Sequence, residues 1–364
     1  MHHPAAKLIS LGIGDTTEPI PPTIVKGLKN ASERLGTKDG YTGYRADQGN
    51  LLLRKKIAEK LYRNVISPEE VIISDGAKCD IGRMQFLLPS NSLIAVQDPA
   101  YPVYVDTTLI SGKKEPVYLS CIPENNFFPD LQKAPKVNAV FFCSPNNPTG
   151  AVSTKEELET LVKWVKKIKA ILIFDAAYSH YIRDPILPRS IFEIEGAKSC
   201  AIEINSFSKM AGFTGVRLSW SIIPLELQFD DGTPVRKDWM RIMTTFFNGA
   251  SNIAQGGAEE ALEDKGLEEI KTQTNFYLEN AKILADTLRK KGLTVYGGTN
   301  APYLWVKIPG KTSWEAFEEL LEKAEIVTTP GSGFGPAGEG FLRFSSFGHR
   351  ENILEAAERL EKHI

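Results

Sequence analysis

The sequence has few of the features that mark secreted, metal-binding or membrane proteins. Only 4 of its 364 residues are cysteines, and none has the C-x-x-C spacing of a zinc or disulfide framework, which predicts reduced thiols in the cytoplasm. The 5 histidines show no H-E-x-x-H pattern, so we predict no metal site. No apolar run is long enough to span a bilayer, and the first residues contain no apolar signal region, so we expect no membrane partner.

An excess of positive charge is also missing. Lys and Arg number 43 against 45 Asp and Glu, a formal net charge of -2, so nothing electrostatic favours nucleic acid as a partner. With 42% hydrophobic and 24% charged residues, the composition is that of a globular protein. The chain is long enough for one large and one small domain with sizeable cores.

Short apolar runs alternate with helical patterns in the middle of the chain. A helical pattern at residues 158–168 lies between two of these runs. This repetition predicts a mostly parallel sheet that is covered by helices on both faces. The expected buried strands lie at residues 71–73, 93–96, 139–142, 170–174 and 200–204.

The pattern changes in the C-terminal third. A long helical stretch runs through residues 267–291 and ends at Gly292. Strand-like segments follow, and the chain closes with an amphipathic helical pattern at residues 353–364. We therefore expect a smaller α+β domain here, with strands at residues 294–296, 303–306 and 341–344.

The segment that carries chemistry is Ser206-Phe207-Ser208-Lys209, followed by Arg217. A lysine amine can bond covalently to an aldehyde, while hydroxyl groups and an arginine can hold a phosphate. Alone, S-x-S-K is a weak signal, and a solvated loop lysine is the simpler interpretation. It gains weight from two upstream motifs in the same chain, NNPTG at residues 146–150 and DAAY at residues 175–178.

In this order the motifs resemble the pyridoxal-phosphate (PLP)-dependent aminotransferases of fold type I. The resemblance implies PLP as cofactor and amino acids and 2-oxo acids as substrates. It also implies an α/β fold, with a large PLP-binding domain at residues 31–270 around a mostly parallel, mainly seven-stranded sheet. The smaller α+β domain would span residues 271–364, and the N-terminal segment, residues 1–30, would join part of it.

Three residues of these motifs would be catalytic. Lys209 would hold the cofactor and shuttle the substrate proton. Asp175, at the end of an apolar strand where open α/β sheets present ligands, would keep the ring nitrogen protonated. Tyr178, together with Asn147, would donate to the phenolate oxygen of the ring, and Tyr101 matches the position that stacks on it.

The phosphate of the cofactor needs a helix start with free backbone amides. Ala77 and Lys78 would supply them just after the strand at residues 71–73, although a plain capped turn would have the same pattern. The side chains of Ser206, Ser208 and Arg217 would complete the phosphate site.

The α-carboxylate of the substrate needs a residue that grips it. Arg343 matches the family's carboxylate-binding arginine, whose planar fork makes two hydrogen bonds, and a surface strand arginine is the alternative. Gly14 matches the backbone that approaches the same carboxylate. Lys78, Tyr101 and Asn147 would also face the substrate.

Finer motifs resemble the LL-diaminopimelate aminotransferases and cover nearly the whole chain. That family moves an amino group between LL-2,6-diaminopimelate and 2-oxoglutarate, giving glutamate and a product that cyclises to tetrahydrodipicolinate. In the biosynthetic direction the reaction feeds lysine and peptidoglycan. The matching segments are residues 11–19, 74–80, 144–150, 174–179, 203–209, 247–251, 301–306 and 341–346.

The resemblance also implies a homodimer with shared active sites. Tyr44 and Asn248 would come from the neighbouring subunit, Tyr44 to the phosphate and the substrate and Asn248 to the substrate. Asp47 would meet the distal ammonium of diaminopimelate. Two departures bear on substrate affinity: Arg45 stands where the family usually has glycine, and only about ten residues precede the segment at residues 12–14.

Three alternatives stay open from the sequence. One is a broad aspartate, aromatic or kynurenine aminotransferase of the same fold, and another is a PLP lyase that eliminates at Cβ. The third is a regulator that uses this fold to bind ligands. Such regulators carry an N-terminal DNA-binding domain, for which this chain has no room.

Overall fold

The computed structural model describes residues 6–44 and 46–363. Arg45, whose charge was expected near the substrate, lies outside the described residues. The large sheet has the strand order β2-β8-β7-β6-β5-β3-β4. Six of these strands run in the same direction, and β8 is antiparallel to both of its neighbours. In chain order they are β2 (Val71–Ser74), β3 (Ile94–Asp98), β4 (Val117–Ser120), β5 (Ala139–Cys143), β6 (Ile171–Asp175), β7 (Ala201–Ser206) and β8 (Ser219–Ile222).

The large sheet is buried on both faces because its strands are apolar at odd and even positions alike. In β6, Leu172 and Phe174 pack into one core, and Ile171 and Ile173 pack into the other. The first core includes residues from α2 (Leu51–Lys56), α5 (Lys155–Ile168) and α8 (Asn252–Ala261), and the second includes residues from α3 (Ala77–Met84), α4 (Val103–Ile110) and α7 (Val235–Phe246). The α/β class and the mostly parallel seven-stranded sheet that the sequence predicts are thus confirmed.

Several helices begin at a residue whose side chain accepts a hydrogen bond from an amide of the first turn. In α5, Thr154 and Glu157 form a reciprocal capping box at the first turn. The helices are α1 (Pro22–Leu35), α2 (Leu51–Lys56, continued by a π-helical turn at Ile57–Leu61), α3 (Ala77–Met84), α4 (Val103–Ile110), α5 (Lys155–Ile168), α6 (Phe207–Met210), α7 (Val235–Phe246), α8 (Asn252–Ala261), α9 (Asp264–Lys290), α10 (Ser313–Ala324) and α11 (Arg350–His363).

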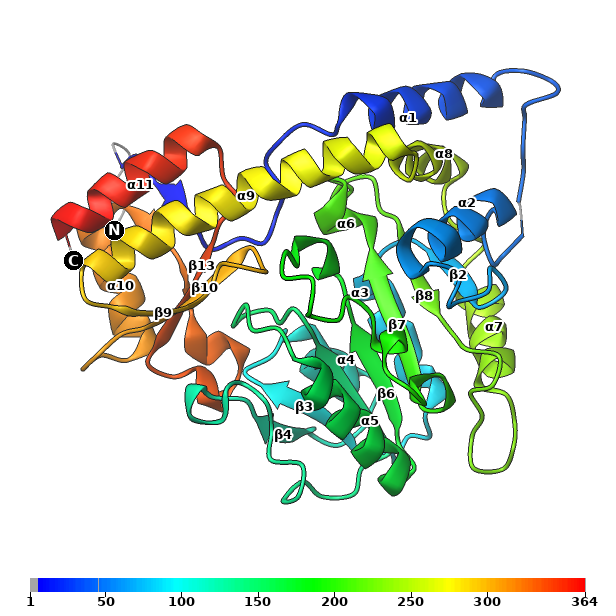
Figure 1. Ribbon diagram of the computed structural model, residues 1–364, viewed down its shortest axis with the longest axis horizontal. Coiled ribbons are helices and arrows are strands. Elements are labelled where there is room, and N and C mark those ends of the chain that lie inside the picture. The colour runs from blue at the N-terminus through cyan, green and yellow to red at the C-terminus, as the bar shows by residue number, and fades with distance from the viewer. Residues whose placement is uncertain (1–5, 45, 364) are drawn as a thin grey trace.

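A second, antiparallel sheet is built from the C-terminal third. Its order is β12-β13-β10-β9, formed by Thr329–Pro330, Phe341–Ser345, Tyr303–Lys307 and Thr294–Gly297. The N-terminal strand β1 (Ile9–Ser10) pairs with β11 (Ile326–Val327), so the start of the chain joins this part of the molecule. Figure 1 shows the long helix α9 running from α1 and α8 at the large sheet to α11 beside the small one.

The boundaries between the large and the small domain, at residues 30 and 270, remain a prediction from the sequence. The division at residue 270 falls inside α9 (Asp264–Lys290), which contacts elements of both parts. The pairing of β1 with β11 supports the assignment of the N-terminal segment to the smaller part.

All four cysteines are free thiols, of which Cys79 is half-buried and Cys121, Cys143 and Cys200 are buried. Among residues 6–44 and 46–363, no helix is long and apolar enough to cross a membrane. Within the same ranges, no cluster of three or more His, Cys, Asp or Glu side chains could hold a metal ion.

Candidate active site

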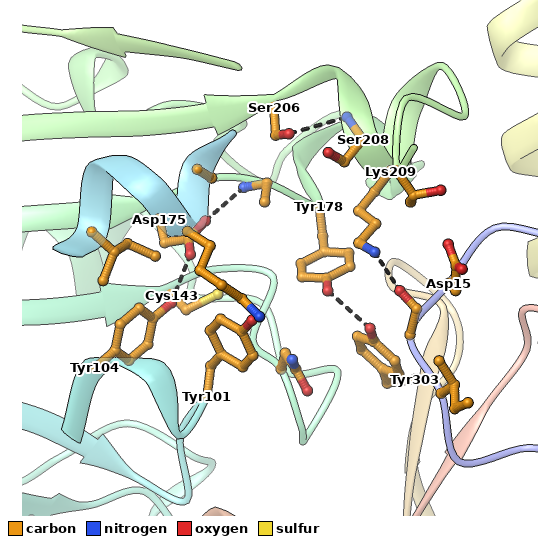
Figure 2. Close-up of a pocket in the computed structure, with 18 of the residues that line it drawn as sticks. Asp15, Tyr101, Tyr104, Cys143, Asp175, Tyr178, Ser206, Ser208, Lys209 and Tyr303 are labelled. Atoms are coloured by element: carbon orange, nitrogen blue, oxygen red, sulfur yellow. Dashed lines mark hydrogen bonds between the residues drawn. The ribbon is translucent and has the colours of Figure 1, made fainter. Parts of the chain in front are cut away.

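A cavity of about 460 Å³ lies where the carboxyl ends of β5, β6 and β7 face the small sheet and the N-terminal segment. Parallel strands present their carboxyl ends at one edge, which is why motifs far apart in sequence meet here. Figure 2 shows side chains from several elements converging on this space. Twelve of the predicted site residues line it: Gly14, Ala77, Lys78, Tyr101, Asn147, Asp175, Tyr178, Ser206, Ser208, Lys209, Arg217 and Arg343.

Asp175 is the last residue of β6, and its carboxyl group is buried. The Tyr104 hydroxyl donates to Oδ2 at 2.7 Å, and the Ala177 amide donates to Oδ1 at 3.0 Å. Burial raises the pKa of Asp175, while these two donors favour its charged form. Neither donor carries a charge, so the carboxylate is suited to a cationic partner such as a protonated pyridine nitrogen.

Lys209 lies in the short helix α6 that follows β7, and its Nζ donates to the Gly14 carbonyl (Figure 2). Burial, helped by the nearby charges of Arg217 and Arg343, lowers the pKa of Lys209 to about 8, although the opposite charge of Asp15 raises it. A lowered pKa increases the fraction of neutral amine at neutral pH. The neutral amine is the form that attacks an aldehyde.

A glycine lets an arginine approach the start of α3. Gly76 has φ +137, and a Cβ added there would lie 2.0 Å from Nη2 of Arg217. The amides of Ala77 and Lys78, in the first turn of α3, have no intrahelical acceptor. An arginine and two amides at one helix start suit a phosphate group.

A second loop adds hydroxyl groups to this site. Ser206 caps α6, and its Oγ accepts from the Ser208 amide at 3.0 Å. Both serines line the cavity. The residues present therefore fit PLP, with its phosphate at α3 and α6 and its ring near Asp175.

A partly buried charge cluster lies beside the start of α3. Arg83 donates to both carboxylate oxygens of Asp75, at 2.7 and 3.1 Å, and to the buried Asp80 at 3.3 Å. Ser74 also donates to Asp80, at 2.6 Å. Burial raises the pKa of Asp80 to about 7. The cluster ties the end of β2 to the first turns of α3 and so holds the turn at Gly76 in place.

Arg343 is buried on β13 and reaches across to the large domain. Its Nη1 donates to Oδ1 of Asn147 at 2.7 Å, and its Nη2 donates to the Gly12 carbonyl. The guanidinium lies over the rings of Tyr303 and Phe334, 4.6 and 4.8 Å from their centroids. These contacts hold a permanent positive charge in the cavity, and among residues 6–44 and 46–363 no acidic side chain forms an ion pair with it, so a substrate carboxylate would complete this environment.

Among the lining residues that the sequence did not predict for the site, four have ionisable side chains: Asp15, Tyr104, Cys143 and Tyr303. Tyr104 lies in the first turn of α4, three residues after Tyr101, and the two rings are in contact with their centroids 5.7 Å apart. Tyr303 begins the APYLWV strand, two residues before the Trp305 that contacts Phe341. The helical and strand periods could have pointed to both tyrosines.

Three predicted residues are not among those that line the cavity: Tyr44, Asp47 and Asn248. Tyr44 has 87% of its surface exposed, and Asn248 is also exposed. Their loops lie together, because a Cβ on Gly249 would be 3.7 Å from the Ala46 carbonyl oxygen and 4.0 Å from the Asp47 Cα. The chain thus gathers these three residues on one face outside its own cavity.

Comparison with known proteins agrees with this geometry. A model of the family described as aminotransferase class I and II matches residues 6–360. The LL-diaminopimelate aminotransferase of Protochlamydia amoebophila is 53% identical over 370 residues, which cover 99% of this chain and 90% of that protein. The chloroplastic LL-diaminopimelate aminotransferase of Arabidopsis thaliana is 52% identical over 374 residues, which cover 100% of this chain and 81% of that protein.

A solved structure shows the same fold. The L,L-diaminopimelate aminotransferase from Chlamydomonas reinhardtii is similar with a TM-score of 0.95 and 52% sequence identity, over 99% of this chain and 91% of that one. Similarity extends over both sheets and every segment that lines the cavity. The chain belongs to the class I and II aminotransferases and, within them, to the family of LL-diaminopimelate aminotransferases.

Proposed function

We propose that the protein is a PLP-dependent transaminase that interconverts LL-2,6-diaminopimelate and 2-oxoglutarate with tetrahydrodipicolinate and glutamate. The observation that carries the proposal is the convergence of Lys209, Asp175 and Arg343 on one cavity, in a chain 53% identical to a named enzyme of this activity. The reaction supplies a precursor of lysine and peptidoglycan.

PLP, when bound, supplies an electron sink for the bond that breaks at the substrate Cα. Lys209 Nζ takes the proton from that carbon and donates it again later in the transfer of the amino group. Asp175 holds a proton on the ring nitrogen, and Tyr104 keeps its carboxylate in place. Arg343 orients the α-carboxylate, so that the Cα hydrogen faces the lysine.

The cavity carries more positive than negative groups, which suits substrates with carboxylates. Lys78, Lys209, Arg217 and Arg343 line it, against Asp15 and Asp175. Arg217 is assigned to the phosphate and Asp175 to the ring nitrogen. Lys209 is assigned to the cofactor, so Lys78 and Arg343 are the cations available to the carboxylates of diaminopimelate, 2-oxoglutarate and glutamate.

A substrate panel tests the activity. The purified protein with PLP is expected to lose its cofactor absorption on addition of LL-diaminopimelate, and 2-oxoglutarate should restore it. Aspartate, phenylalanine and kynurenine are expected to react at least about tenfold more slowly, since none pairs a second ammonium with a second carboxylate. Equal rates for these amino acids would favour the broad aminotransferase. Release of ammonia without conversion of the cofactor to its amine form would favour a lyase.

We further propose a homodimer in which each active site is completed by the partner subunit. Support comes from Tyr44 and Asn248, which lie on exposed loops outside their own cavity. The Asn252 side chain donates to the Thr42 hydroxyl at 2.8 Å, which links the two loops into one surface. In a two-fold dimer, this surface of one subunit can lie against the cavity of the other. Tyr44 would then reach the phosphate and Asp47 the distal ammonium.

Mixing two inactive variants tests this assembly. Lys209→Ala and the double variant Tyr44→Ala/Asn248→Ala are each expected to be nearly inactive as homodimers. After subunit exchange, a mixed dimer has one site with both defects and one intact site, so activity should recover to about a quarter of the native value. The measurement is the transamination rate before and after exchange.

A matched mixture serves as the control for that experiment. Lys209→Ala with Asp175→Ala combines two residues of the same chain's cavity, so no mixed dimer has an intact site and no recovery is expected. If the first mixture also shows no recovery after demonstrated exchange, Tyr44 and Asn248 act within their own chain.

We also propose a cytoplasmic location. The four free thiols support a reducing compartment. Among the relatives, the plant enzyme is named as chloroplastic, so the location belongs to each protein and not to the family. Cell fractionation followed by detection of the protein would test the proposal.

A further inference from the structure

Tyr303 joins the two parts of the molecule inside the cavity. It is the first residue of β10 in the small sheet, and only 1% of its surface is exposed. Its hydroxyl lies 2.8 Å from the hydroxyl of Tyr178, which follows β6 in the large domain (Figure 2). The two rings are 5.2 Å apart at an angle of 70°. A residue of the small domain thus contacts a residue assigned to the cofactor.

The surroundings of Tyr303 leave it little freedom. A Cβ added to Gly14 would lie 2.2 Å from the Tyr303 hydroxyl oxygen, so only glycine there allows this position. On its face, the ring lies 4.6 Å from the Arg343 guanidinium. Phe347 packs at 6.1 Å with its ring nearly perpendicular. The hydroxyl is therefore held at one place, next to Tyr178.

The two hydroxyl groups have one proton each, and the direction of their hydrogen bond decides what Tyr178 can do. Burial raises the pKa of both tyrosines, so both stay protonated at neutral pH. If Tyr178 donated to Tyr303, it would have no proton left for an acceptor in the cavity. If Tyr303 donates, the proton of Tyr178 is free to point at the cofactor.

We propose that Tyr303 is a positioning residue that donates to Tyr178 and thereby directs the Tyr178 proton to the phenolate oxygen of the cofactor. The inference rests on the proposed function, because it assigns a role to Tyr303 in binding PLP. It makes Tyr303 act through Tyr178 and not through any contact of its own with the ring.

The charge of Arg343 supports this direction. Burial raises the pKa of both tyrosines and the positive charge of Arg343 lowers both. For Tyr178 the nearby Tyr303 raises the pKa by more than Arg343 lowers it, which makes Tyr303 the better donor of the pair. The same guanidinium donates to Asn147 at 2.7 Å. Arg343 is thus connected directly to Asn147, and through Tyr303 to Tyr178. These are the two residues assigned to the phenolate oxygen. A substrate carboxylate that neutralises Arg343 would make Tyr303 a weaker donor. It would thereby change the hydrogen bond that Tyr178 donates to the cofactor.

Tyr303→Phe tests the hydroxyl group alone, because it keeps the ring beneath Arg343. The measurement is the pH at which the absorption of bound PLP changes, recorded without substrate. That pH is expected to rise by roughly 0.5 to 1 unit, because the cofactor phenolate loses part of the donor strength of Tyr178. Tyr178→Phe should give a larger rise, and Tyr178→Phe/Tyr303→Phe should equal Tyr178→Phe alone. kcat should fall severalfold in Tyr303→Phe, while KM changes less than twofold.

Tyr277→Phe is the matched control. Tyr277 belongs to the same buried aromatic cluster, and its hydroxyl accepts from the Thr17 and Glu18 amides at 2.8 and 2.7 Å, away from Tyr178. Its loss should lower thermal stability and leave the absorption titration unchanged. An unchanged titration in Tyr303→Phe, or a shift that adds to that of Tyr178→Phe, would overturn the inference. A native protein without PLP absorption would instead contradict the proposed function, and the inference with it.

Discussion

Lys209→Ala is expected to lower the transamination rate by more than about a thousandfold while the protein still binds PLP noncovalently. The variant removes the amine that bonds to the cofactor and moves the substrate proton. Cofactor binding should persist because the phosphate site at Gly76 and Arg217 and the carboxylate of Asp175 do not depend on the lysine. The measurements are the rate with LL-diaminopimelate and the affinity for PLP.

The position of the covalent bond provides the control. Borohydride reduction of the native protein followed by peptide mapping should label Lys209. Lys78 is the other lysine that lines the cavity, with its Nζ 5.9 Å from the centroid of the Tyr101 ring. A label on Lys78 instead would show that the S-x-S-K motif does not hold the cofactor.

Asp175→Asn is expected to lower kcat by roughly a hundred- to thousandfold, as removal of a preorganised electrostatic group does at other active sites. Asparagine keeps the shape of the side chain, its oxygen can still accept from the Ala177 amide, and the Tyr104 hydroxyl can turn to accept from its NH2 group. It cannot hold a proton on the ring nitrogen, so the loss appears in catalysis and not in folding. The measurements are kcat and the melting temperature of the variant with PLP.

Asp98→Asn is the matched control for this substitution. Asp98 also ends a strand of the large sheet, is buried, and accepts from the Ala337 amide at 3.1 and 3.2 Å, but it does not line the cavity. It should lower stability and leave kcat nearly unchanged. Near-native turnover in Asp175→Asn would show that Asp175 has only a structural role at the end of its strand.

The sequence alone was informative wherever local patterns carry the information. Buried parallel strands are apolar on both faces, so β5, β6 and β7 were expected within one or two residues of their observed bounds. Because such strands present their carboxyl ends at one edge, Asn147, Asp175 and Ser206 could be expected to meet. The family resemblance added Arg343, which strand periodicity could not distinguish from a surface arginine.

The tertiary structure decided what depends on contacts between distant segments. The short strand β8 (Ser219–Ile222), which was not expected, buries the polar residues Ser219 and Ser221, and only its insertion between β2 and β7 makes it a strand. The approach of Arg217 to Gly76 joins residues from separate strand–helix units. Such pairings leave no periodic signal in either segment.

The identity of the chemistry was therefore determined by the sequence, through the order of Asn147, Asp175, Lys209 and Arg217 along parallel strand ends. The environment of that chemistry was decided only by the fold. The bond from Tyr104 to Asp175 and the pair formed by Tyr178 and Tyr303 connect residues 71 and 125 positions apart. Burial and hydrogen-bond direction depend on which surfaces close around a group, and the chain acquires those surfaces only when its two sheets pack together.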